Sequence, residues 1–124
     1  MRTLLPLALL VCFSDFQAAN ADALTDVTWG VKAGGAPYVR FQADGRIVGN
    51  ASCNRFWGSY KRSGTELEIS RFATTRKYCG AARMTAERAF LSKLGQARRY
   101  ETGAGSLRLT GQDGSLVLLL HRQP

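Results

Sequence analysis

The chain has 124 residues, of which 45% are hydrophobic and 21% are charged. This is the composition of one small globular domain, and it excludes an intrinsically disordered protein. Thirteen glycines against three prolines favour short strands joined by turns over a bundle of helices. The net charge is +8, with thirteen arginines against four lysines. The excess fits an anionic partner or a genome that prefers arginine codons, and we favour the second because scattered charges usually form a solvated surface.

Residues 1–21 have the pattern of a secretory signal peptide. Arg2 precedes an apolar run at 4–13 that is too short to anchor the chain permanently in a membrane. The Ala-Asn-Ala sequence at 19–21 then supplies the small residues that a signal peptidase requires, so we predict cleavage after Ala21. The mature domain would be 22–124, in which no apolar run reaches the ~18 residues of a transmembrane helix.

The expected location is therefore periplasmic or secreted. A lipoprotein acylated at Cys12 is the less favoured alternative, because Val11 is bulkier than the residue normally found before the modified cysteine. After cleavage, Cys53 and Cys79 remain, and an even pair in an exported chain favours a disulfide. The alternative is a zinc site, which needs about four ligands, whereas His121 is the one histidine of the chain. We predict the disulfide, with no metal and no other cofactor.

The expected elements, taken in chain order, are mainly short strands. Strand-forming residues at 27–29 open the domain, and Val39 and Phe41 alternate with polar residues as in a half-buried strand. Asp44-Gly45 predicts a two-residue hairpin turn, followed by a returning strand at 46–49. Further strands are predicted at 56–60, where Phe56, Gly58 and Tyr60 share one face and Trp57 and Ser59 the other, and at 66–70, 106–110 and 116–120.

One helix is expected among these strands, over about 83–94, with Gly95 placed to end it. The strand at 116–120 is apolar on both faces, with Leu116, Leu118 and Leu120 on one and Val117 and Leu119 on the other, so each face needs a cover. We expect the helix to cover one set of its side chains, and the alternative is an exposed apolar patch that serves as a partner or membrane site. The apolar side of the helix consists of Met84, Phe90, Leu91, Leu94 and Ala97.

Two segments carry a distinctive pattern. They are Phe41-x-x-Asp44-Gly45-Arg46 leading into Gly49-x-x-x-Cys53-Asn54-Arg55-Phe56-x-Gly58-x-Tyr60, and Ala73-Thr74-Thr75-Arg76-x-x-Cys79 followed by Glu87-x-x-Phe90-Leu91-x-x-Leu94. Together these segments resemble the META domain of the heat-shock protein HslJ family. The resemblance runs from Trp29 to the strand at 116–120, and one departure is Lys77-Tyr78, where the family commonly has Met after the arginine.

The resemblance implies a mainly β (α+β) fold: a small antiparallel curved sheet or incomplete barrel with one packed helix. It also implies a place in the bacterial envelope and a link to heat shock, drug tolerance, motility or secretion, without an agreed reaction. Bulky side chains suited to filling a small barrel are Trp29, Phe41, Phe56, Tyr60 and Leu109.

The search for catalytic chemistry is negative. A nucleophilic triad needs a histidine that the fold positions, and His121 lies four residues from the end of the sequence. Glu66 and Glu68 imitate a carboxylate pair, but their neighbours place them on the solvent side of an amphipathic strand. We therefore expect no enzyme.

The residues of the family motif are either binding groups or structural ones, and we favour the structural reading. On that reading Asn54 bonds nearby backbone at a bulge and Arg55 pairs with an acid. Thr74, Thr75 and Arg76 are weighed in the same way.

Glu87 is the least expected residue, because it falls in the middle of the apolar side of the helix. Burying a lone carboxylate is costly, so a cation should meet it. Arg76 is the favoured partner and Arg55 the alternative, since both stand beside the cysteines that the disulfide would draw together.

The function that these observations favour is an exported binding or interaction module that supports envelope integrity or stress tolerance. The alternative is a carrier of a small apolar or lipid ligand inside the barrel, and the two differ in whether side chains fill the interior. We expect a monomer whose partner is an envelope component, with anionic material the preferred kind if the charge matters. Nucleic acid is not expected, because an exported chain rarely meets it and the arginines form no run.

Overall fold

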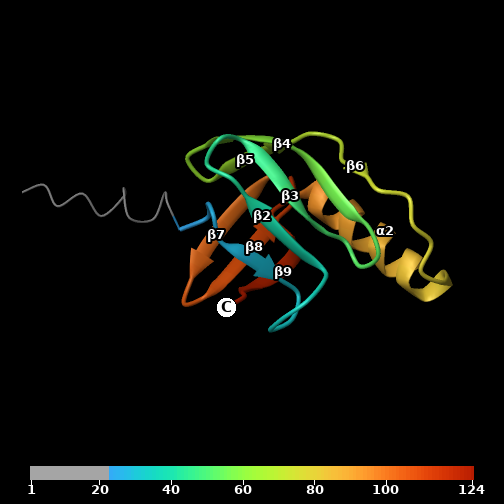
Figure 1. The fold of residues 1–124 in the computed structure, drawn as a ribbon. Coiled ribbons are helices and arrows are strands. Elements are labelled where there is room, and N and C mark those ends of the chain that lie inside the picture. The colour runs from blue at the N-terminus through green and yellow to red at the C-terminus, as the bar shows by residue number, and fades with distance from the viewer. Residues whose placement is uncertain (1–22) are drawn as a thin grey trace, which may run out of the picture.

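The computed structural model describes residues 23–124, so the segment interpreted as a signal peptide, with Cys12, lies outside the described residues. The described part consists of nine strands and one helix, and the helix follows the sixth strand (Figure 1). In chain order these are β1 (Thr28–Gly30), β2 (Tyr38–Phe41), β3 (Arg46–Asn50), β4 (Arg55–Ser63), β5 (Glu66–Ile69), β6 (Ala73–Thr74), α2 (Ala81–Gln96), β7 (Arg99–Gly103), β8 (Ser106–Thr110) and β9 (Leu116–Arg122).

The strands pair in one antiparallel sheet, in the order β3-β2-β1-β9-β8-β7-β5-β4-β6. An additional pairing joins β3, at one end of this order, to β4, next to the other end, so the sheet curls back on itself (Figure 1). The weakest join is between β5 and β7, which share the single register pair Glu66↔Arg99. The mainly β fold with a curved sheet and one helix is thus confirmed.

The first and last strands are neighbours in this sheet. Trp29 and Gly30 of β1 lie opposite Arg122 and His121 of β9. Just beyond β9, the backbone N–H of Gln123 donates to the carbonyl of Thr28 (2.9 Å). The sheet therefore joins segments from the two ends of the described chain.

Side chains fill the interior of the curved sheet. All five bulky residues predicted to lie there are buried: Trp29, Phe41, Phe56, Tyr60 and Leu109. The rings of Phe41 and Tyr60 meet edge to face with centroids 5.2 Å apart, and the Tyr60 hydroxyl donates to the Gln42 carbonyl (2.6 Å). The polar end of the buried tyrosine is therefore satisfied.

The helix is longer than predicted and does not end at Gly95. It runs through Gln96, and Ala97 ends it in an extended conformation, with its N–H bonded to the Leu94 carbonyl. Gly95 is thus an interior helical residue, because the chain turns into β7 without using a left-handed glycine. The helix packs against β9 and buries Glu87, Phe90 and Leu94.

Strand β9 does not alternate as predicted. Leu118 lies opposite Leu109 and Leu116 lies opposite Thr110, so Val117 is an extra residue at a β-bulge. The bulge breaks the period of two: Leu120 is buried, Val117 and Leu118 pack partly against the core, and Leu116 (47%) and Leu119 (41%) are exposed. The expectation that Leu116, Leu118 and Leu120 share one environment is wrong.

The hairpin turn between β2 and β3 has three residues, 43–45, rather than two. Phe41 lies opposite Ile47, and the Gln42 N–H donates to the Arg46 carbonyl (2.8 Å). Gly45 has a φ of 91°, the left-handed conformation that a three-residue loop of this type requires and glycine adopts most easily.

Candidate functional site

The predicted disulfide between Cys53 and Cys79 is present, with Cα atoms 5.8 Å apart and a sequence separation of 26. It ties the loop before β4 to the segment that leads into α2. The two family-typical segments are therefore held together, as the sequence predicted.

Glu87 is buried, with 5% of its surface exposed, but its partners are not the predicted arginines. Its Oε1 accepts hydrogen bonds from the backbone N–H of Asn54 (2.6 Å) and of Cys53 (3.3 Å), and its Oε2 accepts one from Asn54 Nδ2 (2.9 Å). Arg76 and Arg55 are both exposed. The pairing with an arginine is wrong because amide groups already fixed by the disulfide loop satisfy the carboxylate without bringing in a second charge that must lose its water.

Asn54 is buried at 2% exposure and uses every hydrogen-bonding position of its amide. Nδ2 donates to the Lys77 carbonyl (3.0 Å) as well as to Glu87, and Oδ1 accepts from Thr75 Oγ1 (2.8 Å) and from the Lys77 N–H (2.7 Å). The prediction that Asn54 bonds nearby backbone at a bulge is wrong. These bonds reach the segment that precedes α2, more than twenty residues along the chain.

This Asn54–Glu87 network is closed. Within residues 23–124, no buried side-chain nitrogen or oxygen lacks a hydrogen-bond partner. No group of the network is therefore left over for a ligand, and the network fixes α2, the disulfide loop and the segment that follows β6 to one another.

The other motif residues divide between packing and surface. Phe56 is buried against the rings of Phe72 and Phe90. A Cβ at Gly58 would lie 3.1 Å from the Phe72 ring, so the side chain there must be small. Thr74, opposite Phe56 in β6, is half-buried.

Arg55 departs from the expected role, because it pairs with no acid in the described part of the chain. An ion pair between β7 and β5 joins Arg99 to Glu66 at 3.6 Å, with both side chains largely exposed. Glu66 therefore lies on the solvent side of β5, as its neighbours in the sequence predict.

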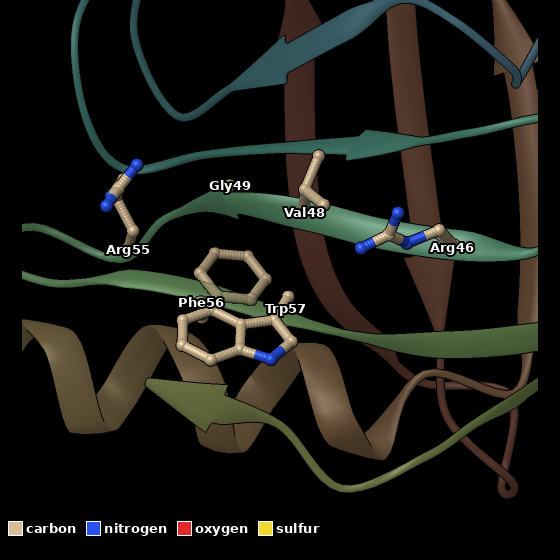
Figure 2. Close-up of a pocket in the computed structure, with 6 residues that line it drawn as sticks. All are labelled: Arg46, Val48, Gly49, Arg55, Phe56 and Trp57. Atoms are coloured by element: carbon tan, nitrogen blue, oxygen red, sulfur yellow. The ribbon is translucent and has the colours of Figure 1, made fainter. Parts of the chain in front are cut away.

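Arg55 instead lines an open pocket of about 290 Å³ on the outward face of β3 and β4. The lining residues are Arg46, Val48, Gly49, Arg55, Phe56 and Trp57. Figure 2 shows Arg46 and Arg55 at opposite ends of the pocket, with the Trp57 indole between them. Trp57 is 44% exposed and lies opposite Val48 in the sheet.

Gly49 and Phe56, which lie opposite each other, also line the pocket. A Cβ at Gly49 would lie 2.7 Å from the Phe56 ring, which packs directly against the glycine backbone. Glycine therefore allows the buried Phe56 ring to approach β3 closely on the inner side of the sheet.

The pocket is electropositive. Strands β2, β3 and β4 contain no Asp or Glu and five basic residues, Arg40, Arg46, Arg55, Lys61 and Arg62. The guanidinium groups of Arg46 and Arg55 make no hydrogen bond or ion pair with any residue in the described range. The nearest acid in sequence, Asp44, accepts a bond from the backbone N–H of Arg46 (3.0 Å) and so belongs to the hairpin turn.

Trp57 was predicted to lie on the opposite face of its strand from Phe56 and Tyr60, but the surface to which it belongs was not predicted. The signal was the strand register: Arg46 lies opposite Ser59, and Asn50 opposite Arg55. Because Ser59 and Arg55 are four residues apart in β4, these pairs place the two arginines on the face of Trp57 with a separation of about 13 Å along the strand direction.

The fold and the site define a small, disulfide-bonded antiparallel β domain with one helix and a basic outward face. The model of the META domain family matches residues 16–124, and the chain belongs to that family. No functionally curated protein matches it.

Solved structures with the same fold share little sequence with the chain. An NMR structure of a protein from Burkholderia xenovorans is similar with a TM-score of 0.63, 22% identity and 98% coverage of both chains. A crystal structure of a DUF4847-family protein from Bacteroides vulgatus is similar with a TM-score of 0.60 and 14% identity, covering 82% of this chain and 94% of that one. At such identities the similarity extends to the fold alone.

Proposed function

We propose that this META domain is an exported, monomeric, non-enzymatic binding module that supports the integrity of the bacterial envelope or its tolerance of stress, including heat shock. The observation that carries the proposal is the pocket with Trp57 between the unpaired guanidinium groups of Arg46 and Arg55. Cations that the protein itself leaves unneutralised favour an anionic partner.

Two further observations support the proposal. The Cys53–Cys79 disulfide is compatible with an oxidising compartment outside the cytoplasm. Glu87 is a buried carboxylate, but its hydrogen bonds are committed to the network with Asn54, which leaves it a structural role.

A carrier function in the interior gains no support from the structure. Buried side chains such as Phe41, Tyr60 and Leu109 occupy the centre of the curved sheet. The pocket that we assign to binding lies on the outer face of the sheet.

The test is co-sedimentation of the purified domain, residues 22–124, with washed cell-envelope fragments. We expect R46S/R55S to abolish most of the binding, and raising the salt concentration to weaken it. R108S/R122S is the matched control, because it removes two exposed arginines from β8 and β9 and changes the net charge equally. Equal binding by wild type and R46S/R55S would refute the assignment of the function to this pocket.

Export is tested separately with the full-length chain. We expect fractionation of the producing bacterium to find the domain outside the cytoplasm, shortened at its N-terminus and without free thiols. A full-length, reduced protein in the cytoplasm would contradict the exported role.

A further inference from the structure

We propose that the pocket on β3 and β4 binds an acidic glycan, with one sugar ring on the Trp57 indole and anionic groups on Arg46 and Arg55. This inference rests on the proposed binding function and names the chemistry of its ligand. It follows from three features: an exposed flat ring, two unpaired cations and the distance between them.

The exposed ring supplies the central contact. Trp57 shows 44% of its surface, lies beside the half-buried Val48 and forms one wall of the pocket (Figure 2). An indole face offers apolar area together with the negative face of a π system, which attracts the slightly positive C–H groups of a sugar ring. A pocket of about 290 Å³ is near the lower end of the usual range for small-ligand sites, which suits a single ring.

The two arginines supply the charge selectivity. Arg46 and Arg55 flank Trp57, with a separation of about 13 Å along the strand direction. A guanidinium binds a carboxylate or phosphate through two parallel N–H groups, so each end of the pocket offers a place for one anionic group. A chain of sugars with repeated acidic groups presents this combination of a ring flanked by anions.

An anionic membrane surface fits the pocket less well. Membrane-binding faces combine basic residues with several exposed apolar side chains that enter the lipid. The large exposed apolar residues of the described chain, apart from Trp57, are Val31, Tyr78, Leu116 and Leu119, and none lies on β2, β3 or β4.

Extended peptides and single-stranded nucleic acids also lack their usual contacts here. A peptide that adds a strand needs a free sheet edge, whereas β3 is paired on both sides, with β2 and with β4. Single-stranded nucleic acid is typically held by successive stacked bases. On this face Trp57 is the one large aromatic residue with substantial exposure.

The experiment is a fluorescence titration of the oxidised domain, residues 22–124, with an oligogalacturonate tetramer. Trp57 reports the binding, while Trp29 is buried and supplies a constant background. Maltotetraose serves as the uncharged ligand of similar length. We expect saturable binding of the oligogalacturonate that weakens with added salt, and no comparable binding of maltotetraose.

Variants then locate the site by calorimetry, which does not depend on the tryptophan signal. We expect about a tenfold loss of affinity for W57A, and about tenfold for each of R46S and R55S. R108S/R122S should bind as wild type does. These side chains are exposed, and unchanged circular dichroism spectra and melting temperatures check that the variants fold.

Three results would overturn the inference. Equal affinity for maltotetraose would show that the anions are not recognised, and equal weakening by R108S/R122S would show that overall charge rather than the pocket attracts the glycan. The third result is that the glycan does not bind, while vesicles of phosphatidylglycerol or a thymidine oligonucleotide bind through Arg46 and Arg55. This result would assign the pocket to another ligand. In that last case the loss of envelope binding by R46S/R55S would still hold, so the proposed function would survive.

Discussion

Replacing Glu87 by alanine would remove the acceptor for three buried donors at once. The backbone N–H groups of Cys53 and Asn54, and the Nδ2 of Asn54, would each lose the bond they make at 3.3, 2.6 and 2.9 Å. A buried donor left unsatisfied costs about 1–3 kcal/mol. Water entering the vacated space would restore part of this, so we expect a net loss of about 4 kcal/mol in the free energy of unfolding. That is a large share of the ~5–15 kcal/mol that holds a small domain folded.

The assay is chemical unfolding of the oxidised domain, followed by tryptophan fluorescence and far-ultraviolet circular dichroism. Glu101→Ala is the matched control, because Glu101 is exposed on β7 and its loss should change the free energy of unfolding by less than about 0.5 kcal/mol.

Glu87→Gln should fall between wild type and Glu87→Ala. A glutamine keeps one acceptor, but its NH₂ group would meet the donors that Glu87 now satisfies. Asn54 cannot turn its amide to compensate, since its Oδ1 already accepts bonds from Thr75 and Lys77. A loss below about 1 kcal/mol for Glu87→Ala would refute the reasoning. So would additive effects of Glu87→Ala and Asn54→Ala in a double-mutant cycle, because contacting residues should couple.

Other predictions concern an ionisable ring, the disulfide and the last strand. Burial raises the pKa of Tyr60, so its contribution to stability is complete below about pH 10 and declines as the pH rises through the raised pKa. The difference in the free energy of unfolding between wild type and Tyr60→Phe, measured from about pH 8 to 11, should therefore shrink as the pH rises. A difference that stays constant would contradict this reasoning. Thiol titration of the denatured, unreduced domain should find no free Cys53 or Cys79, and two free thiols would exclude the disulfide. Replacing both cysteines by serine should lower the free energy of unfolding by about 3.5 kcal/mol for a loop of this length. Leu118→Asp should lower the free energy of unfolding by about 3 kcal/mol or more, whereas Leu119→Asp, at an exposed site, should change it little. Similar losses for both variants would mean that the bulge is misplaced.

Much of the fold was predictable, because the alternation of apolar residues in strands such as β2 and β8 directly reflects burial on one face. Strand β7 was missed, since Arg99–Gly103 contains a single large apolar residue, Tyr100, and forms through its backbone pairing with β8. The bulge at Val117 could not be predicted either, because five consecutive apolar residues give the same hydrophobic pattern whether or not a bulge is present.

The candidate site was only partly predictable. The disulfide followed from the number of cysteines, and the burial of Glu87 followed from its position on the helix. The partners of Glu87 did not follow, because backbone N–H groups occur at every residue and leave no mark in the sequence. The pocket was missed for a related reason: the proximity of Arg46 and Trp57 depends on which strands pair and in what register.

Because β1 pairs with β9, the sheet can close only at the end of synthesis. A protein synthesised from its N-terminus exposes β1 while the partner strand, Leu116–Arg122, does not yet exist. Neighbouring hairpins such as β2–β3 can form early, but the ring of strands closes only after Arg122 has been made. Contacts between such distant segments slow the final step of folding. The nascent chain therefore stays incompletely folded until synthesis ends, a state that is compatible with the export proposed above.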